Sequence, residues 1–154
     1  MAELEIVKYD GCDWDKAHEF ADLISEHDVE VTGESPERWF SVFLYDRRRK
    51  TVGGVAGITS WGLCDVSVVA VAKPYRRQGW GRKLMAAMEE TARRRGCHHV
   101  HLHTMSFQAV GFYKALGYRV LATLPGRKES YTRYFMTKEL PTAAVQRPLP
   151  GART

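Results

Sequence analysis

An almost uninterrupted apolar run over residues 63–72 constrains this chain more than any other feature. The run is rich in valine, a pattern typical of a strand that is buried on both faces in the middle of a sheet. From Gly79 the apolar period becomes that of a helix, which ends at Arg95-Gly96, and residues 100–104 then read as another strand. A strand, a helix and a strand in this order predict a right-handed crossover and a parallel pair, so we expect an α/β fold with a mixed sheet. The expected inner stripe of the helix is Trp80, Leu84, Ala87, Met88 and Thr91.

The segment before residue 40 predicts one strand and two helices. Residues 4–9 alternate as a first strand, and Asp13 is placed to cap a helix with a continuous apolar face. The residues of that face are Trp14, Ala17, Phe20, Ala21 and Ile24. Residues 28–35 are expected to form a loop, followed by a short helix that starts at Ser35-Pro36-Glu37.

Later segments predict more strands, one short helix and a tail. Residues 40–45 and 51–58 flank a charged turn and predict an antiparallel hairpin. Residues 108–116 predict a short helix, and two final strands are expected over residues 118–124 and 131–140. Residues 141–154 contain three prolines and no apolar period, so we expect a disordered tail after a single domain of residues 1–140.

Length and composition favour one globular domain in a reducing compartment. The 154 residues are 44% apolar and 27% charged, enough for a core without disulfides or a metal. Cys12, Cys64 and Cys97 are odd in number and far apart, which fits a reducing cytoplasm better than a disulfide framework or a zinc site. No apolar run of about 18 residues is present, and the first ten residues are acidic and alternating, so neither a membrane span nor a signal peptide is expected.

The positive charge of the chain is concentrated in one segment. The net charge is +5, but residues 73–95 alone contain eight basic and two acidic residues, a net +6. A focused positive region suggests a polyanionic ligand, either a nucleic acid or a cofactor that carries phosphates. The alternative is a solvated helix face that is rich in arginine.

Two glycines mark the junction between the apolar strand and the basic helix. Gly79 and Gly81 allow backbone N–H groups to approach a ligand closely, and the start of the helix adds unpaired donors and a partial positive charge. Such a turn can bind a pyrophosphate. The Walker pattern GxxxxGK[ST] and the dinucleotide pattern GxGxxG are both absent, and a glycine pair alone also suits an ordinary tight turn.

The order of these parts resembles the GNAT acetyltransferase family. Arg76-Arg77-Gln78-Gly79-Trp80-Gly81 is similar to the family's acetyl-CoA loop, Q/R-x-x-G-x-G/A. Residues 108–118, QAVGFYKALGY, are similar to the family's A-x-x-F-Y-x-x-x-G-F/Y element, which usually follows some thirty residues later. Over residues 4–140, the resemblance implies a mixed sheet of about seven strands with splayed central parallel strands and about four helices. Lys73 stands where the family usually has proline, and Ser106 stands where asparagine often contacts the pantetheine arm.

The resemblance also implies a set of cofactor contacts. Backbone amides from Arg77 to Arg82 would hold the pyrophosphate, and the segment from Val69 to Val71 would pair with the pantetheine as an extra strand. The N–H of Val71 would then point at the acyl carbonyl. The full set of expected cofactor contacts is Val69, Ala70, Val71, Arg76, Arg77, Gln78, Gly79, Trp80, Gly81, Arg82, Ser106 and Phe112. Tyr113 would give a proton to the departing thiolate, or would be only a core aromatic.

An amine must lose its proton before it attacks, and no single residue stands out as the base. Asp65 lies where the family often has an acidic residue that acts through water, although it could equally be a surface carboxylate. His99, His101 and His103 alternate and so share one face of a strand. They would lie nearly in a line, which does not suit a metal site. We interpret His103 as the base or an acceptor contact, against the alternative of a partly buried polar face.

The acceptor site is expected between the first helix and the following strand. In similar proteins this region walls the acceptor pocket, and its candidate residues here are Glu30, Glu34 and Trp39. Carboxylates at these positions would suit a cationic amine, or they would simply be solvated.

The leading hypothesis is transfer of an acetyl group from acetyl-CoA to a primary amine in a direct ternary complex. An aminoacyl-tRNA donor is a second hypothesis, because residues 47–50 and 93–95 could contact RNA phosphates. A non-catalytic CoA-sensing module is a third. Nucleic-acid binding is disfavoured because no RNA-binding signature is present. The resemblance is compatible with a homodimer and does not identify the amine.

Overall fold

The structure is a computed structural model that describes residues 5–8 and 10–141. The chain divides into two compact units, Met1–Ser35 and Pro36–Thr154. The expected tail lies outside the described residues except for Pro141. None of the described helices is both long enough and apolar enough to cross a membrane.

The first unit contains one helix, α1 (Trp14–Thr32). The predicted cap at Asp13 is confirmed, because its side chain accepts a hydrogen bond of 3.2 Å from the backbone N–H of Lys16. The helix ends at Gly33, whose φ of 75° is left-handed. The predicted loop over residues 28–35 is therefore wrong up to Thr32, because the helix continues until a residue that readily adopts this conformation is reached.

Two other predictions for the start of the chain are also wrong. Residues 5–8 form no strand, because a strand needs a hydrogen-bonded neighbour and the described part of this unit offers none. Residues 4 and 9 of that predicted strand lie outside the described residues. Residues 34–37 form no helix and lead directly into the first strand of the second unit.

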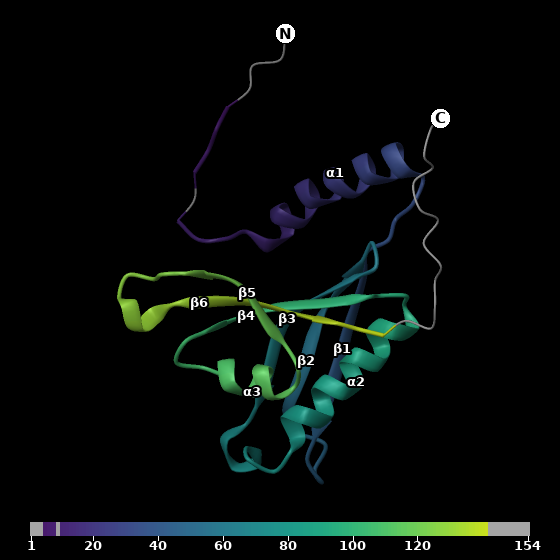
Figure 1. Ribbon diagram of the computed structural model, residues 1–154. Coiled ribbons are helices and arrows are strands. Elements are labelled where there is room, and N and C mark those ends of the chain that lie inside the picture. The colour runs from purple at the N-terminus through teal and green to yellow at the C-terminus, as the bar shows by residue number, and fades with distance from the viewer. Residues whose placement is uncertain (1–4, 9, 142–154) are drawn as a thin grey trace, which may run out of the picture. The chain divides into compact units, whose positions relative to one another are not determined.

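The second unit is built on a six-stranded mixed sheet in the order β1-β2-β3-β4-β6-β5 (Figure 1). The strands are β1 (Arg38–Tyr45), β2 (Thr51–Ser60), β3 (Leu63–Val71), β4 (His99–Met105), β5 (Arg119–Leu124) and β6 (Arg133–Glu139). The predicted β1–β2 hairpin is confirmed, and so is the parallel pairing of β3 with β4. The described residues contain six strands and three α-helices instead of about seven and four.

Helix α2 (Trp80–Arg94) packs against β1, β2 and β3 and supplies much of the core. Its buried residues are Leu84, Met85, Met88, Glu89 and Ala92. The predicted stripe is correct at Leu84 and Met88 but wrong at Ala87, which is exposed. The remaining helical elements are α3 (Val110–Ala115), η1 (Lys73–Tyr75) and η2 (Glu129–Tyr131).

Strand β3 is buried on one face rather than on both. Cys64 and Val66 point into the core, whereas Leu63, Asp65 and Ser67 are exposed. The predicted two-sided burial is therefore wrong in this structure, because side chains alternate along a strand and α2 lies on the side of Cys64 and Val66. The other face of the sheet is left available for polar side chains.

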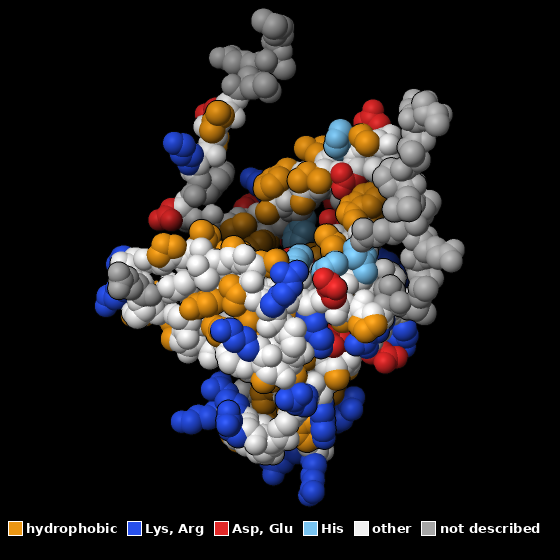
Figure 2. Space-filling model, in the orientation of Figure 1, with side chains coloured by type: hydrophobic (Ala, Val, Ile, Leu, Met, Phe, Trp, Pro, Cys, Tyr) orange, Lys and Arg blue, Asp and Glu red, His pale blue; other side chains and the backbone are white. Residues whose placement is uncertain are grey.

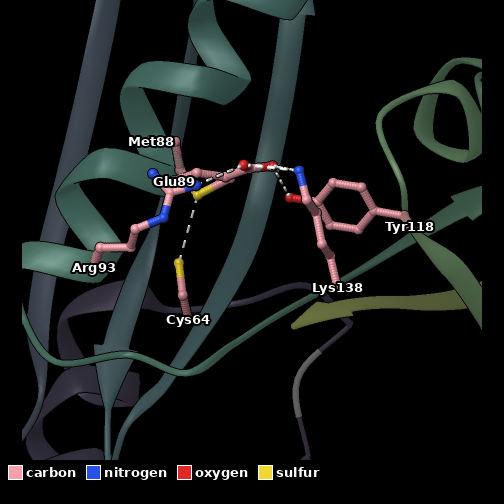
Figure 3. A network of polar contacts seen from close by, with 6 residues as sticks. All are labelled: Cys64, Met88, Glu89, Arg93, Tyr118 and Lys138. Carbon is pink, nitrogen blue, oxygen red and sulfur yellow. Dashed lines mark hydrogen bonds and ion pairs between the residues drawn. The ribbon is translucent and has the colours of Figure 1, made fainter. Parts of the chain in front are cut away.

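A buried carboxylate links α2 to strand β6 and to the residue that precedes β5 (Figure 3). Glu89 accepts two 2.9 Å hydrogen bonds from Lys138 Nζ and one of 3.1 Å from the hydroxyl of Tyr118. Arg93 Nη2 lies 3.4 Å away. Burial and the neighbouring Glu89 raise the pKa of Tyr118, so its phenol stays protonated and donates to the carboxylate.

Neutralising this carboxylate should destabilise the fold. We expect Glu89→Gln to lower the free energy of unfolding by about 2 to 3 kcal/mol, because it leaves the half-buried ammonium of Lys138 without its counter-charge. The matched control is Glu90→Gln. Glu90 is 64% exposed and lies 3.9 Å from Arg94, so its loss should cost less than about 0.5 kcal/mol. Urea unfolding of both variants tests the difference, and equal losses would contradict it.

Candidate active site

The two parallel strands separate partway along their length. Register between β3 and β4 runs from Leu63 and His99 to Val66 and Leu102 and then stops. Strand β3 continues to Val71 and β4 continues to Met105. A gap therefore opens between the carboxyl-terminal halves of the strands, as the predicted splay requires.

The backbone of β3 turns hydrogen-bonding groups into this gap. The N–H of Ala72 donates to the carbonyl of Val52 at the start of β2 (2.8 Å). Because these groups alternate along a strand, Ala70 also faces β2, whereas Val69 and Val71 face the gap. The carbonyl of Val71 agrees with this direction, since it accepts a 2.8 Å hydrogen bond from Arg76 Nε.

The segment that follows β3 presents a run of backbone donors at the start of α2. Arg77 (φ 62°) and Gly79 (φ 82°) are left-handed, which turns the chain sharply into the helix. In the part of the chain that the structure describes, the N–H groups of residues 77–82 have no acceptor. These donors and the helix dipole form a site suited to a phosphate group. The side chain of Gln78 braces the turn by donating to the carbonyl of Pro74 (2.9 Å).

The two glycines of this turn are required for different reasons. Gly79 has open space around its missing side chain but needs its left-handed backbone. Gly81 leaves room for Phe112, since a Cβ at position 81 would lie 3.1 Å from the ring. Phe112 therefore joins α3 to the first turn of α2, beside the expected cofactor turn.

Tyr113 lies next to this contact and is 7% exposed. Its ring packs edge-on against Phe112 and Tyr118, with centroid distances of 5.1 and 5.8 Å. Its hydroxyl has no hydrogen-bond partner among the described residues. Burial raises the pKa of Tyr113, so the phenol remains a proton donor through neutral pH.

The exposed face of the sheet brings Asp65 and the histidines together. Asp65 on β3 is in direct register with His101 on β4, one step before the strands separate. The Nδ1 atom of His101 is buried and has no partner among the described residues. His103 is exposed and packs near Phe135, and His99 Nε2 lies 3.8 Å from Glu139. The register of His101 with Asp65 could not be predicted from the sequence, because alternation does not show which histidine lies opposite Asp65.

No group of three metal-ligating side chains occurs within the described residues. Two of the cysteines are poorly suited to reactive chemistry. Cys64 and Cys97 are buried and free, and burial, helped by Cys97 and Asp65, raises the pKa of the Cys64 thiol to about 12. A thiol with such a pKa is a poor nucleophile at neutral pH.

The remaining residues expected to contact the cofactor or the acceptor belong to different elements of the fold. Ser106 is held by the segment before β6, where its N–H donates to Thr132 (2.8 Å) and its hydroxyl donates to Ser130. Trp39 is 72% exposed, and its β1 register with Ile58 puts it in the same row as Asp65. Glu30 lies in α1 and Glu34 follows α1, both in the first unit.

The basic segment is not one patch. Arg93 and Arg94 pair with Glu89 and Glu90, and Arg95 donates to the carbonyls of Arg38 and Trp39 at 2.8 and 3.2 Å. These arginines lie at the carboxyl end of α2, far from the donors at its start. Figure 2 shows Lys and Arg side chains gathered at the lower end, where Figure 1 places the β1–β2 turn and the start of α2.

The sequence and the fold are similar to those of known proteins. The chain is 32% identical over 106 residues to blasticidin-S acetyltransferase of Streptomyces morookaense, an alignment covering 68% of this chain and 78% of that protein. It is 28% identical to acetyltransferase Atu2258 of Agrobacterium fabrum, covering 79% of this chain and 88% of that protein. A crystal structure of an Agrobacterium tumefaciens protein assigned as an acetyltransferase matches with a TM-score of 0.80 and 26% identity, covering 89% of this chain and all of that chain.

The family model described as acetyltransferase (GNAT) family matches residues 5–118. The chain therefore belongs to the GNAT family and is an N-acetyltransferase.

Proposed function

We propose that this enzyme transfers an acetyl group from acetyl-CoA to a primary amine by direct attack in a ternary complex. One observation supports this most: the N–H groups of residues 77–82, which have no acceptor among the described residues, adjoin a gap into which Val69 and Val71 turn their backbone groups. The first set suits a pyrophosphate, and the second suits an extended amide arm and a thioester carbonyl. Acetyl-CoA supplies both features together with an activated acyl group.

Each group of this chain then has a task. Arg77 and Arg82 are exposed beside the donor run and would screen the phosphates. Val71 N–H, or Val69 N–H two residues earlier, would donate to the acetyl carbonyl oxygen as the carbon–sulfur bond breaks. Tyr113 would give its phenolic proton to the leaving thiolate.

The proton of the amine would go to His101. Its Nδ1 lacks a partner among the described residues and lies at the point where the strands separate, with Asp65 in register beside it. His103 is the second candidate, because it lies two residues farther toward the open end of the gap. A substitution at each position distinguishes them, as the Discussion sets out.

The direct test measures thiol release from acetyl-CoA with a panel of amines, including blasticidin S, a peptide N-terminus and a lysine peptide. Saturable release that depends on the amine supports the proposal. No release with any amine, together with tight CoA binding, would favour a CoA-sensing module. Transfer only from aminoacyl-tRNA would replace the donor, although the ion pairs and hydrogen bonds of residues 93–95 do not favour that reading.

The cofactor turn can be tested separately. Gly79→Val should weaken CoA binding by at least about 100-fold, because valine disfavours the left-handed backbone that aims the donors at the pyrophosphate. Gly96→Val is the matched control, since Gly96 is also left-handed with open space but lies at the other end of α2. Calorimetry with CoA compares them. Equal affinity of both folded variants would show that the pyrophosphate binds elsewhere.

Tyr113→Phe tests the proton donor. The substitution keeps the packed ring and removes only the hydroxyl, so kcat should fall about 100-fold while CoA affinity and melting temperature change little. Because burial raises the pKa of Tyr113, any alkaline loss of activity due to this phenol should occur above the ordinary value of 10 and be absent in the variant. Normal turnover would leave water as the donor.

A further inference from the structure

We propose that the cavity between the β1–β2 turn and the start of α2 is a second ligand site, which binds a planar aromatic molecule carrying a carboxylate or phosphate. The cavity measures about 470 Å³, within the range of small-molecule sites. Its lining includes the apolar Leu44 and Val52 together with aromatic and cationic side chains. None of the steps proposed for acetyl transfer uses these side chains.

The cavity is separate from the gap proposed for acetyl-CoA. It is lined by the end of β1 and the start of β2, which lie on one side of β3 in the strand order. The gap lies on the other side, between β3 and β4, where Val69 and Val71 turn their backbone groups. Only Gln78 and Trp80, at the entry to α2, belong both to the cavity wall and to the expected cofactor turn.

Three aromatic side chains contribute to the wall, namely Tyr45, Tyr75 and Trp80. Two of them already attract cations. Arg49 lies over the Tyr45 ring at 4.7 Å, and Lys83 lies over the Trp80 ring at 4.4 Å. Aromatic walls favour a planar ring through stacking, and the adjacent cations favour one that carries negative charge.

The charge of the wall is positive because the two guanidinium groups of Arg47 and Arg48 outnumber its one carboxylate, Asp46. Asp46 Oδ1 accepts hydrogen bonds from the backbone N–H groups of Arg48 and Lys50, at 2.8 and 2.9 Å. Neither Arg47 nor Arg48 has a carboxylate within ion-pair distance in the described part of the chain. Two guanidinium groups are therefore available to bind an anionic group in the cavity.

The shared wall residues link the two sites. A ligand against Trp80 would touch the first residue of α2, whose N–H belongs to the run expected to hold the pyrophosphate. Its binding should therefore change the affinity for CoA, and by thermodynamic linkage CoA should change its affinity equally.

The test is calorimetry with adenosine 5′-monophosphate and indole-3-acetate, each with and without saturating CoA. Adenosine and indole serve as uncharged counterparts. With CoA present, at least one of the two anionic probes should bind about tenfold or more tightly than its uncharged counterpart. Binding of adenosine 5′-monophosphate would identify a nucleotide site, and binding of indole-3-acetate would identify a site for an aromatic carboxylate. The variant Arg47→Ala/Arg48→Ala should weaken that probe about tenfold or more. Arg94→Ala/Arg119→Ala removes equal charge from exposed positions outside the cavity and should leave it unchanged.

Absence of binding by both anionic probes would overturn the proposal. So would equal binding by the two double variants, or complete displacement by CoA, which would place the probe in the cofactor site. The titrations without CoA test the cavity even if CoA itself fails to bind. In that case the proposed acetyl transfer is rejected, while the affinities of the two double arginine variants for the probe still test the second site.

Discussion

His101→Gln is expected to lower kcat/KM about 1000-fold while CoA affinity stays at the wild-type value. Glutamine approximates the size and polarity of the imidazole but cannot accept a proton from an ammonium group. The expected size follows from the usual contribution of a positioned base, about 10² to 10⁴-fold. The Nδ1 of His101 is buried without a partner among the described residues, so this nitrogen is not engaged in a structural hydrogen bond.

The matched controls come from the same strand face. His103→Gln and His99→Gln remove the same ring from exposed and half-buried positions, and each should change kcat/KM less than about threefold. A larger loss at His103 would move the base to the open end of the gap and would reject the assignment of His101.

Gly57→Ala is expected to cost about 3 kcal/mol or more of unfolding free energy, a decrease in melting temperature of about 10 °C. An added Cβ would lie 2.0 Å from the backbone oxygen of Asp65 and 2.9 Å from the ring of Phe40. The first of these is backbone in the neighbouring strand, at a register shift between Ala56 and Gly57, so no side-chain rotation relieves it. The chain must move, and the row that contains Asp65 must move with it.

Gly111→Ala provides the comparison. Gly111 lies in α3 with nothing within 4 Å of its missing Cβ and an ordinary φ. Alanine should be neutral there or stabilise the helix by up to about 1 kcal/mol. Thermal melts of both variants test the difference. If the melting temperature of Gly57→Ala were within 2 °C of the wild-type value, the strands at the register shift would have to relax at a cost of about 1 kcal/mol or less.

Elements whose own period identifies them could be predicted from the sequence. Helix α2, the β1–β2 hairpin and the β3–β4 parallel pair carry strong local patterns, and the structure confirms all three. Residues 5–8 alternate as well, but alternation does not provide a neighbouring strand. The polar residues up to Thr32 led to the wrong prediction of a loop. A helix ends where a residue such as Gly33 can adopt a left-handed conformation, and polarity alone does not show that position.

The candidate site likewise has one part that could be predicted from the sequence and another that could not. The glycine turn before α2 could be found because its chemistry is contiguous in the chain. The opposition of Asp65 and His101 could not, since a shift of one residue in register would have put a different residue beside Asp65. The contact between Gly81 and Phe112 joins two motifs that sequence reasoning treated as independent cofactor contacts.

The position of β6 in the sheet has a consequence for how the enzyme is made. Strand β6 is the last of the described strands along the chain, yet it lies between β4 and β5 and pairs with both. While the ribosome is still producing residues 133–139, β4 has an open edge and β5 has no neighbour at all. Such an unpaired edge is a template for association with other chains. Folding of the nascent enzyme therefore depends on prompt synthesis of β6, and a stall shortly before residue 133 would expose the histidine-bearing strand to aggregation.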